Sequence, residues 1–454
     1  MSAKLNNSWR PRFLKILPGM ALLMVAALLL VWGWVQATLH PTPGPSPVTP
    51  NSFYSSTSID SPNITNDGQA ATVVVDLRDK QNHPIAGERV RLVPSAAFMT
   101  SASGRTDRLG MVLLRTTVRS GARHMAPSAG PLRLTVVDET HHIPIPHALT
   151  LTVYNRVAVL LQGVGTSLHC RDRACLEPMF MPLVSGVLKP LGYRTAIAAP
   201  AILEYSYQGG AMINDGGAWT WKPRSYDACD TLQSVSHSAQ VLRDMLVAYR
   251  ARYPYSTFEL VGHSLGGLVA MQAIGYHFLW QQIGPLGVDK LVTIDSPVNG
   301  ITDVHALSWL VDGLAGIWHL HDCPAQGFGL DLVGELSGLG DQAPARQHAW
   351  AAVAKAHGAA ILTVTNRDDL LVPEAYALLD ADSPASVVDR IRLSVAPLQS
   401  LGHSSLLYPV QAGGVANLSW PGFAATLRMY LRQPCLVFSP RDAKCPYPSI
   451  NRGF

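Results

Sequence analysis

The pattern of hydrophobic and polar residues changes several times along the chain. Residues 16–35 are uncharged and mostly apolar, and residues 41–63 are rich in proline, serine and threonine. Short runs of alternating polarity follow up to about residue 154. From Arg156 onward, short apolar runs alternate with segments of helical periodicity. Each pattern predicts a different kind of structure.

The first apolar stretch predicts a transmembrane helix over residues 16–38, because it is long enough to cross a bilayer. Four basic residues precede it: Lys4, Arg10, Arg12 and Lys15. By the positive-inside rule they place residues 1–15 in the cytoplasm and the remainder of the chain outside. A cleaved signal peptide is the alternative, since Val35-Gln36-Ala37 loosely matches a cleavage site. We therefore expect a single-pass cell-membrane protein with its catalytic domain extracellular, or otherwise a secreted one. Residues 39–64 are expected to be an extended linker.

Residues 65–154 predict a small antiparallel β-sandwich, because turn residues separate short β-rich runs. These runs are 72–77, 89–93, 111–114, 132–137 and 149–153.

Residues 155–432 predict a mostly parallel sheet covered by helices on both faces, which is an α/β fold. The apolar runs expected as strands are 157–161, 194–199, 258–261, 291–294, 361–365 and 391–395. Helical patterns cover 232–252, 265–279 and, as a closing helix, 421–431. Residues 433–454 contain Cys435 and Cys445 and predict a stapled tail.

The candidate chemistry centres on Ser264, which follows an apolar strand and precedes a helix. Gly262 and Gly266 remove side chains that would clash in so sharp a turn, which is the setting of a Gly-x-Ser-x-Gly nucleophile. The amide of Leu265 would lie at a helix N-terminus and could donate to an oxyanion. The sequence thus offers an exposed serine beside a hydrogen-bond donor.

With the motif Gly262-His263-Ser264-Leu265-Gly266-Gly267, residues 155–432 resemble the α/β-hydrolase family and, within it, bacterial extracellular lipases and esterases. The resemblance implies a base after the last core strand, and His403 in Gly402-His403-Ser404 matches that loop. It also implies an acid turn, matched by Asp369 before Val372-Pro373. Asp368 and Asp295 remain alternatives for the acid.

The same resemblance implies a second oxyanion donor in the loop after the first core strand. That loop is Gln162-Gly163-Val164-Gly165, and the backbone amide of Val164 is the expected donor. Gln162 stands where the family often has histidine. An apolar insertion between residues 294 and 361 is either a lid over the serine or a cap that only packs.

The sandwich segment resembles bacterial Ig-like modules of the invasin and intimin type. The resemblance rests on Ala71 to Asp79, His83-Pro84-Ile85-Ala86-Gly87 and Thr106-Asp107-Arg108-Leu109-Gly110. It implies a spacer with no chemistry of its own, which could contact a surface or a glycan.

Composition bears on the partners, the disulfide bonds and the metal sites that the chain could have. The chain has 454 residues, is 48% hydrophobic and carries a formal net charge of +4, and no basic and aromatic run predicts a nucleic-acid partner. Six cysteines allow fifteen pairings. Two pairs are close in sequence, Cys170 with Cys175 and Cys435 with Cys445, and pairing by proximity would leave Cys229 and Cys323 as a long-range pair. His319-x-His321-x-Cys323 lacks a fourth ligand, so we predict no metal site there. A serine nucleophile with an acid and a base requires no cofactor, and we predict none.

The predicted function is hydrolysis of carboxylic esters, with an ester or lipid as substrate, through an acyl-enzyme on Ser264. An acyltransferase would use the same residues and a different acceptor. A surface adhesin with an inert hydrolase domain is the alternative from another class.

Overall fold

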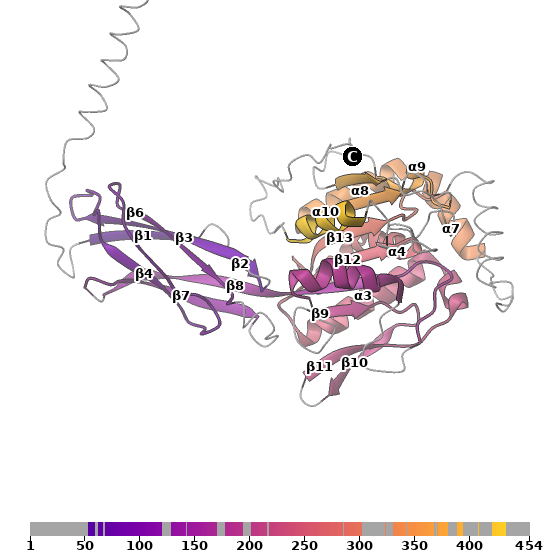
Figure 1. The fold of residues 1–454 in the computed structure, drawn as a ribbon, viewed down its shortest axis with the longest axis horizontal. Coiled ribbons are helices and arrows are strands. Elements are labelled where there is room, and N and C mark those ends of the chain that lie inside the picture. The colour runs from indigo at the N-terminus through magenta and orange to yellow at the C-terminus, as the bar shows by residue number, and fades with distance from the viewer. Residues whose placement is uncertain are drawn as a thin grey trace, which may run out of the picture.

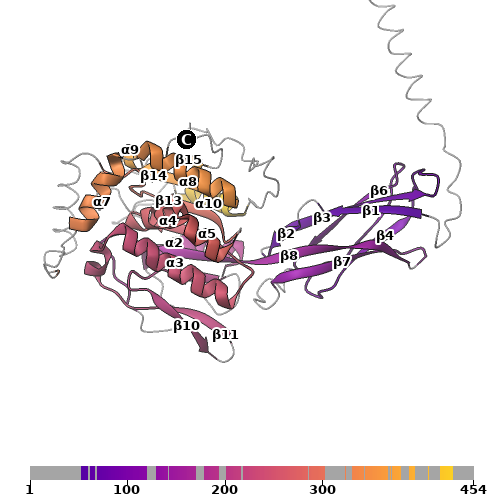
Figure 2. The same ribbon diagram turned by 180° about the vertical axis from the view of Figure 1, so that it is seen from behind.

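The structure is a computed structural model that describes most of residues 53–432. Within that range it leaves out 60–61, 67–68, 120–128, 142, 170–177, 194–200, 216–217, 285, 302–322, 324–329, 342, 367–368, 370, 380–387, 394–406 and 408–419. An all-β unit and an α/β unit lie side by side along the long axis of the molecule (Figures 1 and 2).

The all-β unit is a sandwich of two sheets around one apolar core. One sheet has the order β1 (Phe53–Ile59), β3 (Ala70–Asp79), β6 (Met111–Thr117). The other has β5 (Ala102–Arg105), β4 (Arg89–Pro94), β7 (Gly130–Asp138) and β8 (Ile143–Leu161), with β2 (Asn63–Thr65) beside β8. Buried and less buried residues alternate along β3 and β6, because successive side chains of a strand point to opposite faces.

The described part of the α/β unit contains six parallel strands. Their order is β9 (Ala201–Glu204), β8, β12 (Ser256–His263), β13 (Val288–Ile294), β14 (Ala360–Asn366), β15 (Val388–Leu393). Every residue of β12, β13 and β14 is buried, including polar ones such as Glu259 and Lys290, as expected for parallel strands that are covered on both faces.

Helices cover both faces of this sheet. Val157, Val159 and Leu161 of β8 belong to the core that also contains residues of α3 (Val235–Arg252), α4 (Leu265–Gly275) and α8 (Ala343–His357). Ala158 and Leu160 belong to a second core with α10 (Trp420–Arg432) and the helical turns 178–191. Strand alternation therefore divides one apolar run between two cores.

Smaller elements complete the unit. They are α2 (Met181–Leu183) with the π-helical turn Val184–Leu188, α5 (His277–Ile283), α7 (Leu330–Asp341), α9 (Glu374–Ala377) and the hairpin β10 (Gly210–Asp215) and β11 (Ala218–Pro223). The sequence patterns did not predict that hairpin. The helix expected over 265–279 is divided at Tyr276, whose backbone is extended.

β8 passes from one unit into the other without a linker. Residues up to Tyr154 pair with β7 and β2, and pairing with β12 starts at Asn155. The Nδ2 atom of Asn66 donates to Asn155 Oδ1 at 3.0 Å, and the amide of Asn155 donates to the carbonyl of Tyr255 at 2.8 Å. The expected domain boundary at 154/155 thus falls inside one hydrogen-bonded strand.

A buried network of charges lies just beyond this junction. Arg156 contacts Glu259 and lies 3.3 Å from Asp289, while Lys290 lies 3.5 Å from Glu259 and 3.4 Å from Asp289. Lys290 also donates to the carbonyl of Leu431, at the end of α10, at 2.6 Å. Two positive and two negative groups therefore balance each other away from water. Burial raises the pKa of Glu259, although the charges of Arg156 and Lys290 act against this.

Some predictions meet the structure only in part. A spacer was predicted for residues 39–64, yet β1 and β2 lie at the end of that range, where Ile64 is fully buried in the sandwich core. Phenylalanine, tyrosine, threonine and isoleucine in this stretch favour strands, and that local preference prevails.

Other predictions fall on residues outside the description. The transmembrane helix expected over 16–38, the cytoplasmic segment 1–15 and the tail 433–454 are among them. None of the helices that the structure does describe combines the length and the apolar character needed to span a bilayer.

The charge network should be a large contributor to stability. We expect Arg156→Met to lower the free energy of unfolding by about 3–5 kcal/mol, because two carboxylates would share one remaining cation in a buried site. The measurement is urea denaturation followed by circular dichroism. Arg89→Met is the matched control: Arg89 pairs with Glu139 with its side chain 58% exposed, so a loss of about 0–1 kcal/mol is expected. Equal losses in the two variants would contradict the assigned role.

Candidate active site

Ser264 stands on a sharp turn between β12 and α4. Its backbone has φ 54° and ψ −130°, a conformation that non-glycine residues rarely adopt. Its amide donates to the carbonyl of Ile294 at 2.9 Å, and its carbonyl accepts from the amide of Gly267 at 3.1 Å. Hydrogen bonds to β13 and to the first turn of α4 therefore hold the strained residue in place.

The neighbouring glycines are required by close packing. A Cβ at Gly262 would lie 2.4 Å from the Cα of Gly267, and one at Gly266 would lie 2.4 Å from the carbonyl oxygen of Leu161. A Cβ at Gly267 would lie 2.0 Å from Ser296 Oγ. The spacing of glycines in the sequence thus reflects a turn with no room for side chains on three sides.

The loop after β8 lies directly against the serine. A Cβ at Gly163 would be 2.7 Å from Ser264 Cβ and 3.0 Å from Ser264 Oγ. Val164 follows Gly163, and Leu265 begins α4, whose first amides have no partner within the helix. Gly163, which precedes Val164, therefore lies against Ser264, and Leu265 follows Ser264 directly in the chain.

A hydrogen-bond network holds this loop, and its centre is Gln162. Tyr226 donates from its hydroxyl to Gln162 Oε1 at 2.7 Å, and Tyr207 donates to the Gln162 carbonyl at 2.8 Å. The Nε2 group of Gln162 donates to a carboxylate oxygen of Glu204. Gln162 is fully buried. Burial raises the pKa of Tyr207, so its hydroxyl keeps the proton that it donates.

Two further bonds fix the residues after Gln162. Thr166 Oγ1 donates to the Gly163 carbonyl at 2.7 Å, and the Gly165 amide donates to Thr231 Oγ1 at 2.9 Å. The loop beside Ser264 is therefore anchored from both sides. Sequence reasoning missed the roles of Glu204, Tyr207 and Tyr226; the only signal was a Tyr-x-Tyr pair directly after a short apolar run.

Two of the three candidate acids follow the adjacent strands β13 and β14. Asp295 directly follows Ile294, the residue that binds the Ser264 amide, and its own amide donates to the Val364 carbonyl at 2.9 Å. Asp369 follows β14, and its Oδ1 accepts from the amides of Leu371 and Val372 at 2.8 and 3.0 Å. Asp295 and Asp369 are both buried.

The remaining predicted residues are not described. Asp368 and the base candidate His403 lie outside the described residues. Leu407, four positions after His403, is described and is fully buried in the core beside α10. His263, which precedes the nucleophile, is also buried.

One disulfide bond is present among the described cysteines. Cys229 and Cys323 are bonded, with 5.5 Å between their Cα atoms, which confirms the long-range pair. The sulfur of Cys323 is therefore unavailable to the His319-x-His321-x-Cys323 motif. The other four cysteines, His319 and His321 lie outside the described residues, as does the segment 302–322 of the insertion in which a lid was expected.

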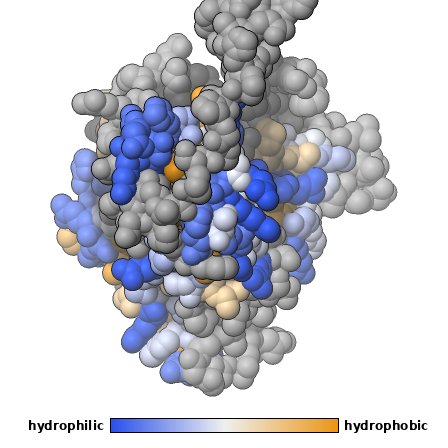
Figure 3. All heavy atoms as spheres, turned by 90° about the vertical axis from the view of Figure 1, so that its left-hand side faces the viewer, coloured by the Kyte–Doolittle hydropathy of each residue, from blue (hydrophilic) through white to orange (hydrophobic). Residues whose placement is uncertain are grey.

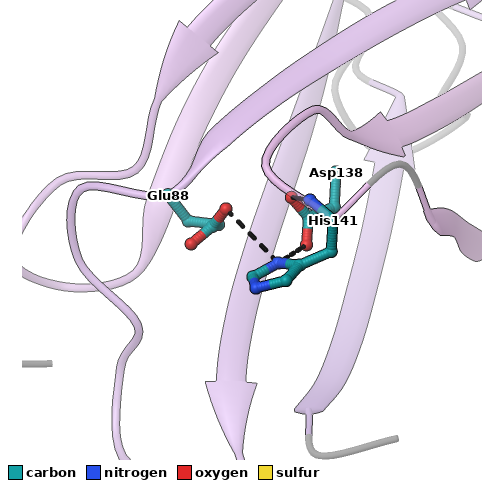
Figure 4. A group of neighbouring side chains, drawn as sticks. All are labelled: Glu88, Asp138 and His141. Carbon is teal, nitrogen blue, oxygen red and sulfur yellow. Dashed lines mark hydrogen bonds and ion pairs between the residues drawn. The ribbon is translucent and has the colours of Figure 1, made fainter. Parts of the chain in front are cut away.

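A group of potential metal ligands lies in the sandwich, well away from Ser264. His141 Nδ1 is 2.8 Å from Asp138 Oδ2 and 3.8 Å from Glu88 Oε1 (Figure 4). Burial raises the pKa of Glu88. The amides of Thr140 and His141 donate to the other oxygen of Asp138 at 2.9 and 3.2 Å, so the turn itself accounts for this arrangement. β8 separates the group from the serine by roughly 60 Å of extended chain.

Comparisons with known proteins add little to this geometry. No protein-family model and no curated protein matches the chain. A lipase-esterase related protein from Clostridium acetobutylicum is 10% identical over 61% of this chain and 95% of its own, with a TM-score of 0.33. A monoacylglycerol lipase from Paleococcus ferrophilus is 12% identical over 61% and 93%, with a TM-score of 0.31.

A third solved structure is weaker still in its likeness to this chain. An adhesin from Yersinia pseudotuberculosis is 16% identical over 26% of this chain and 33% of its own, with a TM-score of 0.19. Likeness at these levels is too low to carry a conclusion about family or function. The strand order, the helices on both faces and the turn at Ser264 nevertheless fit an α/β-hydrolase fold by their own geometry.

Proposed function

We propose that the chain is a serine hydrolase that cleaves carboxylic esters through an acyl-enzyme. The observation that carries the proposal is the position of Ser264, held at φ 54° with the Gly163 loop against its side chain. A strained, glycine-flanked serine between a buried strand and a helix N-terminus has no structural advantage over an ordinary turn. In the proposed site its hydroxyl lies beside the backbone amides of Val164 and Leu265, as acyl transfer requires.

The proposed reaction has two halves. Ser264 Oγ bonds to the acyl carbon as His403 takes its proton, and Asp369 stabilises the charged ring. The amides of Val164 and Leu265 donate to the oxyanion, and the carbon–oxygen bond to the alcohol breaks as His403 returns the proton to it. Water then attacks the acyl-enzyme with the same proton transfers, which releases the acid and restores Ser264.

The network around Gln162 supports the oxyanion part of this mechanism. Preorganised donors contribute most when they need not move during the reaction. Tyr226, Tyr207 and Thr166 hold the carbonyls and the side chain of the Gln162–Gly163 segment. The Val164 amide that follows is therefore held in place before substrate binds.

We further propose a lipid or other apolar ester as substrate, and action outside the cytoplasm. The Cys229–Cys323 disulfide supports this location, because structural disulfides persist in oxidising compartments. A membrane anchor over residues 16–38 would keep the enzyme near lipid. Neither an organic cofactor nor a metal has a step in the proposed reaction.

An acyltransferase remains the second candidate, since an alcohol in place of water would accept the same acyl group. The adhesin alternative has less support. Hydrophilic side chains dominate the described part of the face at the free end of the sandwich, with only scattered hydrophobic ones (Figure 3). A broad apolar patch of the kind that marks a strong protein interface is not seen on that part of the face.

Ester hydrolysis should depend on Ser264. We expect the purified full chain in detergent to release p-nitrophenol from p-nitrophenyl esters, with faster turnover for longer acyl chains if the substrate is a lipid. Ser264→Ala removes the nucleophile and should lower kcat by about 10⁴-fold or more. Ser296→Ala is the control, because Ser296 Oγ bonds to the carbonyl of Ile294 at 3.1 Å, within the protein. Retention of full activity by Ser264→Ala would rule out the proposed mechanism.

The close approach of the Gly163 loop provides a second prediction. Gly163→Ala places a methyl group 2.7 Å from Ser264 Cβ, so either the serine or the oxyanion loop must shift, and we expect kcat to fall by about 10²-fold or more. Gly334→Ala in α7 is the control, since nothing lies within 4 Å of its added Cβ. Steady-state kinetics on one ester measure both variants. A Gly163→Ala enzyme as active as the control would show that the loop is not part of the site.

A further inference from the structure

Asp295 is an unusual residue for the end of a parallel strand. It is completely buried, and its backbone has φ 47°. Its Oδ1 atom accepts from the amide of Asn366 at 2.6 Å, while its Oδ2 atom has no hydrogen-bond partner within the described part of the chain. A carboxylate in that setting would carry its charge with a single donor, away from water, which costs several kcal/mol by general estimates.

Asp369 has the better environment for a negative charge. Two backbone amides, those of Leu371 and Val372, donate to its Oδ1 atom. Its own amide donates to the carbonyl of Asn366 at 3.1 Å. Asn366 therefore links the two acids, because its amide binds one and its carbonyl binds the other.

The two acids also interact electrostatically. Burial raises the pKa of Asp295 well above its ordinary value, and the charge of Asp369 raises it further. Asp369 is the one charged group among the described residues that acts on Asp295 in this way. Two neighbouring buried carboxyls do not both ionise readily, so the proton stays on the one with fewer donors.

We propose that Asp295 is a neutral carboxylic acid that positions the acid of the triad, and that Asp369 carries the only negative charge of this pair. The Oδ1 atom of Asp295 accepts from the Asn366 amide and so holds the turn that presents Asp369. The inference rests on the proposed function, since it assigns Asp369 as the partner of His403. It separates two candidate acids that the sequence left open.

Three variants of the full chain test the assignment through ester hydrolysis. Asp295→Asn keeps a neutral acceptor for the Asn366 amide and suits a positive φ, so kcat should stay within about 3-fold of the parent. Asp295→Gly also suits the backbone but deletes the acceptor, and a turn displaced by about 1 Å should lower kcat about 10- to 100-fold. Asp369→Asn removes the charge that orients the histidine and should lower kcat about 10⁴-fold.

Thermal unfolding at two pH values tests the protonation state without using activity. A folded-state pKa raised above the unfolded value near 3.9 costs no stability below that pH, and costs progressively more as pH rises toward the folded pKa. Asp295→Asn removes that cost. The difference in Tm between Asp295→Asn and the parent should therefore be more favourable to the variant at pH 7.5 than at pH 4, by at least about 2 °C.

Each outcome decides the proposal. It is overturned if Asp295→Asn loses as much kcat as Asp369→Asn, or if its relative Tm is the same at both pH values. A kcat near that of the parent in Asp295→Asn, together with a lowered kcat in Asp295→Gly, supports the positioning role. Failure of the proposed function is recognised separately. In that case the ester hydrolysis rate of Ser264→Ala would equal that of the parent, whereas the Tm comparison of Asp295→Asn does not depend on activity.

Discussion

The structure depends first on β8, a single strand that belongs to both units. Residues up to Tyr154 complete the sandwich, and those from Asn155 to Leu161 form a central strand of the parallel sheet. Arg156 enters the buried charge network one residue past the junction, and Gly163 reaches the serine two residues past the end of the strand. A shift of register in β8 would therefore disturb the core, the charges and the candidate site together.

The candidate site combines this strand with two strained turns at the ends of the next two strands of the sheet, β12 and β13. Ser264 after β12 and Asp295 after β13 both have positive φ, and the carbonyl of Ile294 between them binds the Ser264 amide. Strain of this kind is retained where surrounding contacts enforce it, and it is commonly found at functional positions. At this edge of the sheet, glycine packing, backbone hydrogen bonds and buried carboxyls meet within a few residues. The opposite end of the same strands has the balanced ion network instead.

Much of the fold was predictable because apolar runs and helical periods report burial directly. The strands around Val157–Leu161, Phe258–Val261 and Leu291–Ile294 lie within β8, β12 and β13. The sequence also predicted the turn at Ser264, since glycine on both sides of a serine has a steric meaning. Local patterns could not reveal that β8 continues through both units. Polar and apolar residues alternate in its first part and apolar residues are consecutive in its second, and these two patterns predict two separate strands.

The parts of the site that sequence reasoning missed depend on contacts between distant residues. Glu204 and Tyr226 support Gln162 from positions 42 and 64 residues away, and no spacing rule links them. The choice between Asp295 and Asp369 depends on how many backbone donors each carboxylate receives, which only the folded turns decide. The same holds for Arg156, which as an isolated residue in the sequence looks like an ordinary strand-edge cation.

The most direct test of the central claim is covalent labelling of the nucleophile. An organophosphate ester such as diethyl p-nitrophenyl phosphate phosphorylates a serine only when a base and an oxyanion hole activate it. Peptide mass spectrometry of the labelled full chain should find one diethyl phosphoryl group, on Ser264, with loss of esterase activity in proportion to labelling. Labelling of another serine in step with the loss of activity, or unlabelled Ser264 in an inactivated protein, would contradict the account.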